Sequence, residues 1–240
     1  MRYNKARKNK MTKTLKHIAI IPDGNRRWAR AQGLSVLSGH KKVVDEVFPK
    51  LVEKAVELGI ECLTLWVFST ENWGRDHDEV EGLMKLFVQF CDRANKELNK
   101  QGIRVSFIGR RDNLPEELQK KMTELISSTN QNNKMLVNIA LNYGGRDEIV
   151  RAVNKILERG EYSEIGEQTL SDYLDTSTLD LPDPDLIIRP GGEKRLSGFM
   201  SWQAAYSELY FSDKMMPEFG PDDLQAAVDD FYSRQRRFGK

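Results

Sequence analysis

Residues 17–29 read HIAIIPDGNRRWA, and this stretch decides the fold class. Residues 17–21 form a short apolar run that ends in a turn, which is typical of a buried β-strand. The turn consists of Pro22, Asp23, Gly24 and Asn25. A helix is predicted from about Asn25 to Gly33, so the strand leads directly into a helix.

The rest of the chain continues this alternation of strands and helices. Short apolar runs predict further strands at 62–68, 103–108, 135–141 and 186–188. Apolar residues at helical spacing predict helices at 39–58, 80–98, 115–127, 145–157 and 222–232. The sequence has no internal repeat and no linker, so we expect a single α/β domain over residues 17–240. Its central, mostly parallel sheet should be flanked by helices.

The composition is that of a globular protein, since 39% of the 240 residues are hydrophobic. The 37 basic and 36 acidic residues nearly cancel, so the overall charge indicates no class of partner. Cys62 and Cys91 lie in apolar patterns and are predicted to be buried thiols in a reducing cytosol. Cysteines and histidines form no metal-binding pattern, which argues against a zinc hydrolase or a histidine-based acyl transferase.

The first 16 residues differ from the rest, because they hold seven basic side chains and no acidic one. We expect residues 1–16 to be a disordered, solvated tail. Alternatively, the tail binds anionic lipid headgroups and places a cytoplasmic protein at the inner face of the membrane. Nucleic-acid binding is disfavoured, since Tyr3 is the only aromatic residue there. No apolar run in the sequence is long enough to span a membrane.

The loop after the first predicted strand suits an anion, because ligands of parallel sheets bind where the strands end. It consists of Asp23, Gly24, Asn25, Arg26, Arg27 and Trp28. Free N–H groups at a helix start and two arginines favour a phosphate, and the carboxylate favours a divalent cation. In the alternative interpretation, Asp23 only shapes the turn or caps the helix.

The loop after the second predicted strand combines hydroxyls, a carboxylate, an amide, an indole and a guanidinium. These are Ser69, Thr70, Glu71, Asn72, Trp73 and Arg75. Helix capping explains Ser69 or Thr70. Capping does not explain Trp73 and Arg75 together, which favours a ligand site.

A third basic loop follows the strand at 186–188, where Arg189, Lys194 and Arg195 surround two glycines. Planar guanidinium groups bind phosphate through paired hydrogen bonds. Glu208 lies further on among apolar and aromatic residues, so it must be paired or metal-bound if it is buried. Alternatively, it faces solvent from a strand. The basic C-terminus is expected to be solvated on its pattern alone. Several phosphate-directed clusters and two carboxylates favour a site for two diphosphates that share a cation.

Six segments in this order and approximate spacing resemble the cis-prenyltransferase family, which includes the undecaprenyl diphosphate synthases, or isoprenyl transferases. They are HIAIIPDGNRRWA at 17–29, Gly39-His40, FSTENW with Arg75, NYGGR at 142–146, IRPGGEKRLSGF at 188–199, and WQAAYSELYF at 202–211. The resemblance covers residues 17–239. It implies elongation of an allylic diphosphate, such as farnesyl diphosphate, by isopentenyl diphosphate with Mg²⁺. It also implies a homodimer with an apolar tunnel and a polyprenyl product that serves as a lipid carrier for cell-wall or glycan synthesis.

The resemblance implies roles for the candidate residues. Asp23 would bind Mg²⁺ and assist the departure of diphosphate, with Glu208 as a second Mg²⁺ ligand. The allylic diphosphate is expected at Gly24, Asn25, Arg26, Arg27, Trp28 and His40. The homoallylic substrate is expected at Ser69, Thr70, Glu71, Asn72, Trp73 and Arg75, and its diphosphate at Arg189, Arg195, Leu196 and Ser197. Arg237 and Gly239 would extend from one subunit of the dimer to this diphosphate site in the other. Asn72 is the usual proton acceptor, but an amide is a poor base, so it either accepts the proton or only positions the substrate.

The chain departs from the family pattern at four positions. Val36 stands where an arginine often binds the allylic diphosphate, and we hypothesise that Arg26 supplies the missing charge. Pro190 and Gly198 change the shape of the third loop but spare its arginine and serine positions. Val67 is larger than the alanine common in long-chain members and is expected to narrow the tunnel. Alternatives on the same fold are a short-chain or irregular coupling, or a non-catalytic accessory subunit; the complete motif set argues against the accessory subunit.

Overall fold

A six-stranded sheet forms the centre of the molecule in the computed structural model, which describes residues 14–234. The strand order is β3-β4-β2-β1-β5-β6, and every pair is parallel. The strands are β1 (His17–Ile20), β2 (Cys62–Ser69), β3 (Ile103–Ile108), β4 (Met135–Tyr143), β5 (Leu186–Pro190) and β6 (Glu208–Ser212). All nine residues of β4 are buried, as expected of a parallel strand covered on both faces.

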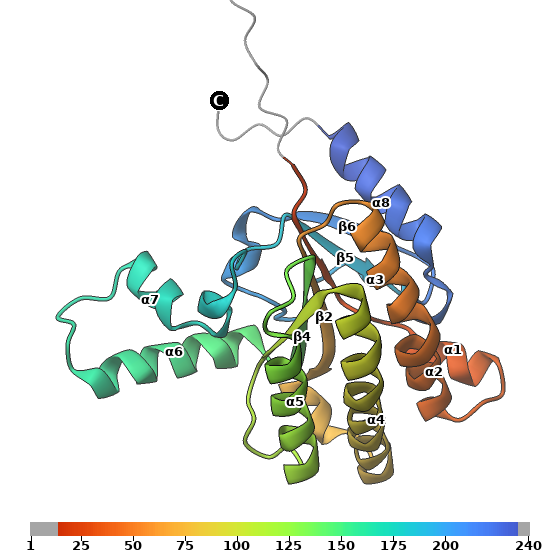
Figure 1. The fold of residues 1–240 in the computed structure, drawn as a ribbon, viewed down its shortest axis with the longest axis horizontal. Helices are drawn as coiled ribbons and strands as arrows, with labels where there is room; N and C mark the ends of the chain where they lie inside the picture. Colours follow the sequence, from red (N-terminus) through yellow and green to blue (C-terminus); the bar gives the residue numbers. More distant parts are fainter. Residues whose placement is uncertain (1–13, 235–240) are drawn as a thin grey trace, which may run out of the picture.

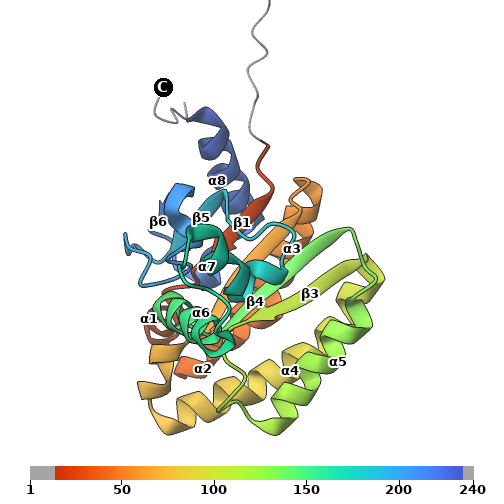
Figure 2. The same ribbon diagram turned by 90° about the vertical axis from the view of Figure 1, so that its left-hand side faces the viewer.

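Helices cover both faces of this sheet, as Figures 1 and 2 show. They are α1 (Asn25–Ala31), α2 (Val36–Lys42), α3 (Phe48–Glu57), α4 (His77–Gln101), α5 (Glu116–Thr129), α6 (Gly145–Arg159), α7 (Glu167–Tyr173) and α8 (Pro221–Ser233). The main hydrophobic core joins one face of the sheet to α3, α4, α5 and α8. On the other side, α6 and α7 pack together around a small core of their own.

The sequence predicted the fold class, the first five strands and most of the helices. The helix expected at 39–58 is a continuous run of α2 and α3 joined by a π-helical turn at Val43–Val47. Such a turn widens the helix by one residue and leaves no signature in hydrophobic spacing. The sequence did not predict α7 or β6. With seven residues, α7 is too short for a periodic signal. The edge strand β6 has five residues, all half-buried, and so lacks a clear apolar pattern. The strand proposed as the alternative setting for Glu208 is therefore present.

The cysteines Cys62 and Cys91 are buried free thiols, as predicted. The carboxyl ends of β1, β2, β4 and β5 meet at one edge of the sheet, since Ile20 is level with Leu65 and Ile188. The three candidate loops leave the sheet at this edge. Within residues 14–234, no helix has both the length and the apolar character needed to cross a membrane.

Candidate active site

Asp23 lies just beyond β1 and links two of the candidate loops. Its Oδ1 accepts a hydrogen bond from the N–H of Gly24 at 2.6 Å, and its Oδ2 accepts one from Arg189 Nη2 at 2.8 Å. Arg27 Nη2 lies 3.4 Å from Oδ1 and donates to the carbonyl of Gly191 at 2.6 Å. The loops after β1 and β5 are therefore joined around one carboxylate.

Two glycines allow these loops to approach so closely. Gly24 has a φ of 90° and Gly191 a φ of 100°, a region that residues with side chains rarely adopt. A Cβ at Gly24 would lie 2.8 Å from Met215 Cβ, and one at Gly191 would lie 3.0 Å from Asp23 Cβ. Any larger residue would push the loops apart.

The surroundings of Asp23 keep its carboxylate ionised. Burial alone would raise the pKa of Asp23, but the hydrogen bonds from Arg189 and Gly24 and the charges of Arg189 and Arg27 outweigh it and lower the pKa. An ionised carboxylate is the ligand that hard divalent cations prefer.

His40 lies beside this cluster as a neutral ring. Burial and the positive charges of Arg75 and Arg26 lower the pKa of His40 to about 3. Its Nδ1 lies 3.2 Å from Asn25 Nδ2, which can only donate, so the ring proton is on Nε2. Glu79 Oε1 is 3.9 Å from that Nε2 and 3.1 Å from Arg75 Nη1.

Several buried polar atoms at this place lack a hydrogen-bond partner. In the described residues there are six such side-chain atoms, and three of them are Asn25 Oδ1, His40 Nε2 and Arg189 Nε. All three residues line the same cavity. Buried polar atoms in folded proteins are nearly always paired, so these three are suited to receive a polar ligand.

The loop after β2 is a single 3₁₀ turn, Thr70–Gly74, with reciprocal capping between Ser69 and Asn72. Asn72 Oδ1 accepts a hydrogen bond from the Ser69 N–H at 3.2 Å. Capping thus explains Ser69 and also occupies the oxygen of Asn72. Trp73 Nε1 donates to Asn142 Oδ1 at 2.8 Å, so Trp73 is held from the end of β4.

The loop after β5 folds around Arg189, whose residue is only 5% exposed. Arg189 Nη1 donates to Ser197 Oγ at 2.9 Å and to the carbonyl of Arg195. The Arg195 guanidinium is exposed and forms an ion pair with Glu193. One buried arginine therefore organises the loop and a second, exposed one remains at its rim.

A cavity of about 380 Å³ joins these groups, within the size range of small-molecule sites. Its polar wall holds nine of the predicted residues: Asp23, Asn25, His40, Ser69, Glu71, Asn72, Arg75, Arg189 and Ser197. Its inner wall is apolar and comes from the π-helical turn, α3, β2 and α4: Val43, Val44, Phe48, Val67, Phe68, Leu83, Leu86 and Phe87.

The inner end of the cavity is nearly closed. Beyond Phe48, Val67 and Phe87 the free space falls to about 10 Å³, roughly the volume that one water molecule needs. A chamber of about 90 Å³ follows near Phe90 and Val137. The structure thus shows an apolar pocket with Val67 at its inner constriction, and the continuous tunnel implied by the resemblance stays a prediction.

Other predicted residues adjoin the cavity without lining it. Five of them belong to the same loops as the lining residues: Gly24, Thr70, Trp73, Arg195 and Leu196. Arg27 lies on α1. Arg26 and Trp28 lie on α1: Arg26 Nε is 3.6 Å from Glu79 Oε2, and Lys42 Nζ is 5.5 Å from the Trp28 ring centre. Glu79 takes up part of the Arg26 charge, and the compensation for Val36 stays a prediction. Arg237 and Gly239 lie outside the described residues.

Glu208 is not brought to Asp23 within one chain. It begins β6, level with Leu186 at the amino end of β5, whereas Asp23 contacts Gly191 beyond the carboxyl end. Five residues of strand separate the two levels, which is roughly 16 Å. In this chain Glu208 Oε2 accepts a hydrogen bond from Arg234 Nη1 at 2.8 Å.

Sequence reasoning missed two supporting residues, Glu79 and Asn142. Glu79 follows Arg75 at the i,i+4 spacing of a helical ion pair, so a signal was present. Asn142 belongs to the NYGGR segment, but its contact with Trp73 joins residues 69 positions apart, and no local pattern shows that.

The site fits a cation that shares its ligands with phosphate. Asp23 supplies one ionised carboxylate and Glu71 lines the same cavity. Mg²⁺ usually binds one or two carboxylates together with substrate phosphates. Across residues 14–234, the one group of three side chains close enough to hold a metal is the exposed set His77, Asp78 and Glu81, none of which lines the cavity.

Comparison with known proteins identifies the family. Residues 21–239 match the family described as putative undecaprenyl diphosphate synthase. The chain is 47% identical to the isoprenyl transferase of Aquifex pyrophilus, over 93% of this chain and 95% of that one. It is 41% identical to the farnesyl-diphosphate-specific ditrans,polycis-undecaprenyl-diphosphate synthase of Legionella pneumophila, over 93% and 95%.

The fold agrees with these relatives. Lavandulyl diphosphate synthase from Lavandula x intermedia, solved with dimethylallyl diphosphate, superposes with a TM-score of 0.91 at 38% identity. The alignment covers 95% of this chain and 99% of that one. On the sequence match, the shared fold and the shared motifs, this chain belongs to the cis-prenyltransferase family of undecaprenyl diphosphate synthases.

Proposed function

We propose that this protein elongates an allylic diphosphate, such as farnesyl diphosphate, with isopentenyl diphosphate units and releases diphosphate. One observation carries the proposal: a single cavity joins an arginine-rich polar mouth to an apolar interior. The two halves match the two halves of a prenyl diphosphate. The apolar half contributes because each buried CH₂ is worth about 0.8 kcal/mol.

Two diphosphates would occupy the mouth side by side. The allylic diphosphate lies over Asn25, His40 and the start of α1, where the buried N–H at His40 Nε2 has no partner. The homoallylic substrate lies between the Ser69–Arg75 loop and the Arg189–Ser197 loop. Neutral His40 donates from Nε2 without adding charge, and Arg189 supplies the charge.

The reaction breaks the allylic C1–O bond, and the diphosphate leaves with the electron pair. The C1 carbon then bonds to the terminal alkene carbon, C4, of isopentenyl diphosphate, which leaves positive charge on C3. A proton leaves C2, and its C–H electron pair forms the new double bond between C2 and C3. Arginines and N–H groups that are already oriented stabilise the charge that develops on the leaving group. Asn72 Oδ1 is engaged by its own loop, so Asn72 positions the substrate and the departing diphosphate accepts the proton.

Mg²⁺ is the proposed cofactor, held by Asp23 together with phosphate oxygens. When bound, it neutralises negative charge on the diphosphate and makes it a better leaving group. The lowered pKa of Asp23 keeps this ligand available at neutral pH.

A homodimer would complete the site. Glu208 lies at the far end of the sheet from Asp23 of its own chain, but a second copy placed against edge strand β6 could receive it. The neighbouring Tyr206 is 80% exposed, which suits a surface covered by a partner. Arg237 and Gly239 would reach across the same interface. Sedimentation analysis tests this point, because a monomer at all concentrations would exclude it.

The product is proposed to be a polyprenyl diphosphate that serves as a lipid carrier. The basic residues 1–16 would bring a cytoplasmic enzyme to anionic membrane lipids, where such a product partitions. Vesicle co-sedimentation with and without residues 1–12 measures this contribution, which should fall as salt rises.

The central experiment incubates the purified chain with farnesyl diphosphate, labelled isopentenyl diphosphate and Mg²⁺. We expect a labelled, extractable prenyl product, and we expect Asp23→Ala to abolish it. Asp78→Ala is the matched control, because the Asp78 side chain is 96% exposed. No product from the wild-type chain would contradict the proposal and favour an accessory subunit. Chromatography of the dephosphorylated product separates repeated elongation from a single short-chain or irregular coupling.

A further inference from the structure

The end of β4 lies between the two loops that would hold the homoallylic substrate. In the sheet, Tyr143 is level with Ser69, the last residue of β2. On its other side, the N–H of Gly145 donates to the carbonyl of Gly198 at 2.9 Å, next to Ser197. Residues 142–145 therefore touch both loops, although none of them lines the cavity.

Asn142 makes the first contact with the Ser69–Arg75 loop. It is 1% exposed and has a φ of 51°, a left-handed conformation that asparagine tolerates better than most residues. Its Oδ1 accepts the indole hydrogen of Trp73 at 2.8 Å. Its Nδ2 donates to the carbonyls of Arg110 and Asp112 at 3.3 and 3.2 Å, so the side chain cannot rotate without losing all three bonds.

Gly144 and Gly145 make the closest contacts, one with each loop. A Cβ at Gly144 would lie 2.5 Å from Thr70 Oγ1, whereas the other Thr70 atoms are at least 3.6 Å away. A Cβ at Gly145 would lie 2.5 Å from the carbonyl oxygen of Gly198 and 2.7 Å from the amide nitrogen of Ser201. The two loops thus close on this backbone from opposite sides.

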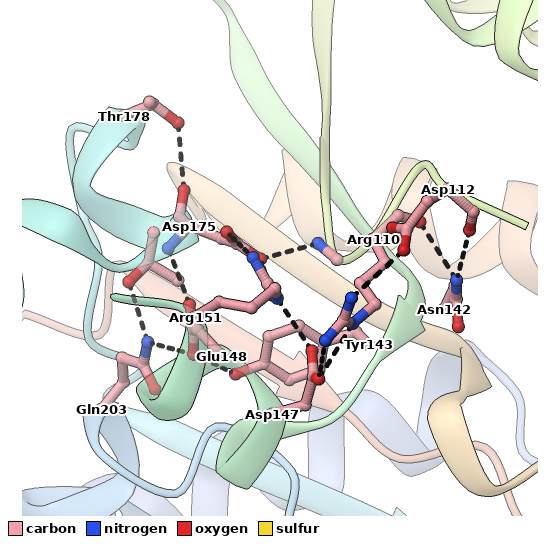
Figure 3. A network of polar contacts seen from close by, with 12 residues as sticks. Arg110, Asp112, Asn142, Tyr143, Asp147, Glu148, Arg151, Asp175, Thr178 and Gln203 are labelled. Atoms are coloured by element: carbon pink, nitrogen blue, oxygen red, sulfur yellow. Dashed lines mark hydrogen bonds and ion pairs between the residues drawn. The ribbon is translucent and has the colours of Figure 1, made fainter. Parts of the chain in front are cut away.

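A network behind β4 holds this backbone in place, as Figure 3 shows. Tyr143 donates its hydroxyl hydrogen to Glu148 at 2.6 Å. Buried Glu148 also accepts from Gln203 Nε2 at 3.1 Å and from the N–H of Asp175 at 2.9 Å. Arg110, the residue whose carbonyl accepts from Asn142, pairs with Asp147 at 2.7 Å. The segment is therefore fastened on the side away from the cavity.

We propose that residues 142–145 act as a positioning strap that sets the distance between the Ser69–Arg75 loop and the Arg189–Ser197 loop. The strap fixes Trp73 and Thr70 on one side and Gly198, beside Ser197, on the other. It acts through these loops and does not touch substrate. The inference rests on the proposed function, since it assigns the gap between the loops to isopentenyl diphosphate.

The test uses Gly144→Ala, in which the added methyl group displaces Thr70 and hence its loop. We expect kcat/KM to fall about tenfold or more, because small misplacements of binding groups are costly in a preorganised site. The fall should come from a raised KM for isopentenyl diphosphate, with the KM for farnesyl diphosphate changed less than about twofold, as expected if only one subsite is deformed.

Rescue distinguishes positioning from general damage. Thr70→Ala removes the atom that the new methyl group meets, so the double variant should be no worse than Thr70→Ala alone. Gly166→Ala is the matched control, because a Cβ there meets nothing within 4 Å and its φ of −88° suits alanine. Equal changes in both KM values, or a double variant as impaired as Gly144→Ala, would overturn the proposal.

A second readout does not depend on activity. The indole N–H signal of Trp73 in ¹H–¹⁵N spectra, assigned with Trp73→Phe, should shift in Gly144→Ala and return in the double variant. An unmoved signal overturns the strap even if the enzyme is active. If the wild-type chain is inactive but the Trp73 signal still shifts in Gly144→Ala, the proposed function is refuted and the contact between the strap and the Ser69–Arg75 loop stands. If Gly144→Ala does not fold, Asn142→Gly, which tolerates the backbone angle, should move the same signal and the same KM.

Discussion

Two polar regions meet at the carboxyl edge of the sheet, and they differ in how completely their buried atoms are paired. The mouth of the cavity has three buried side-chain atoms without a partner, on Asn25, His40 and Arg189. In the network of Figure 3, Glu148 accepts three hydrogen bonds, and Gln203 Oε1 is the one such unpaired atom.

This difference indicates that the mouth is built to bind a ligand and that the network around Glu148 is built to hold the backbone. A buried polar atom without a partner costs stability, and a ligand that pairs with it recovers that cost on binding. A network in which nearly all polar atoms are paired gains little from a ligand and instead limits how far its backbone can move. Substitutions at the mouth should therefore reduce activity more than stability, and substitutions in the network should do the reverse.

The largest effect is expected at the mouth, for Asp23→Asn. The variant keeps the shape of the side chain but loses the negative charge that is proposed to bind Mg²⁺, and kcat should fall about 10³-fold. The midpoint of thermal unfolding should fall moderately, because the one oxygen of Asn still accepts from Arg189 while its NH2 group then faces the N–H of Gly24. Steady-state rates and thermal unfolding measured together check this. A variant that is active but much less stable would invert the comparison.

The next effect is expected in the network, for Glu148→Ala. Three donors, on Tyr143, Gln203 and the backbone of Asp175, lose their acceptor in a buried place. The free energy of unfolding should fall by about 3 kcal/mol or more. Urea unfolding measures this, with Glu158→Ala on the exposed side of the same helix as the control. A loss below about 1 kcal/mol would show that the three hydrogen bonds to Glu148 are not all formed in solution.

A smaller effect concerns His17, a buried histidine far from the mouth. Its Nε2 lies 2.7 Å from Thr64 Oγ1, and burial lowers the pKa of His17 to about 4. The unfolded chain, with a histidine pKa near 6.5, takes up the proton first as the pH falls. The contribution of His17 to the free energy of unfolding is therefore complete above about pH 6.5 and is lost as the pH falls toward 4. Between pH 6.5 and 5 the free energy of unfolding should fall by about 2 kcal/mol because of this group. Urea unfolding of wild type and His17→Gln at both pH values tests this, and an unchanged pH dependence in the variant would contradict it.

The smallest effect is expected in the apolar wall, for Val67→Ala. The substitution widens the constriction between Phe48 and Phe87, so the product distribution should move toward longer chains. Stability should fall by less than about 2 kcal/mol, since Val67 is only half-buried. Chromatography of the dephosphorylated products measures the change. If the products keep their length, the side chains that limit the length of the prenyl chain lie deeper in the pocket.

Much of the site was predictable because its residues lie at or just after the carboxyl ends of strands. Asp23, Asn72 and Arg189 stand at the ends of β1, β2 and β5, and a parallel sheet brings such ends to one edge. Glu208 could not be placed in this way, because it starts a strand and therefore lies at the opposite edge.

Local sequence by itself determined the alternation of strands and helices, the polar loops that follow the strands and the charges those loops carry. These properties depend only on neighbouring residues and on the rule that ligands of parallel sheets bind where the strands end. Only the tertiary structure decided which polar atoms stay unpaired, where the apolar pocket closes, and that residues 142–145 lie between two distant loops. The physical reason is that pairing and packing join residues far apart in the chain, such as Trp73 and Asn142, and no local pattern encodes such a distance.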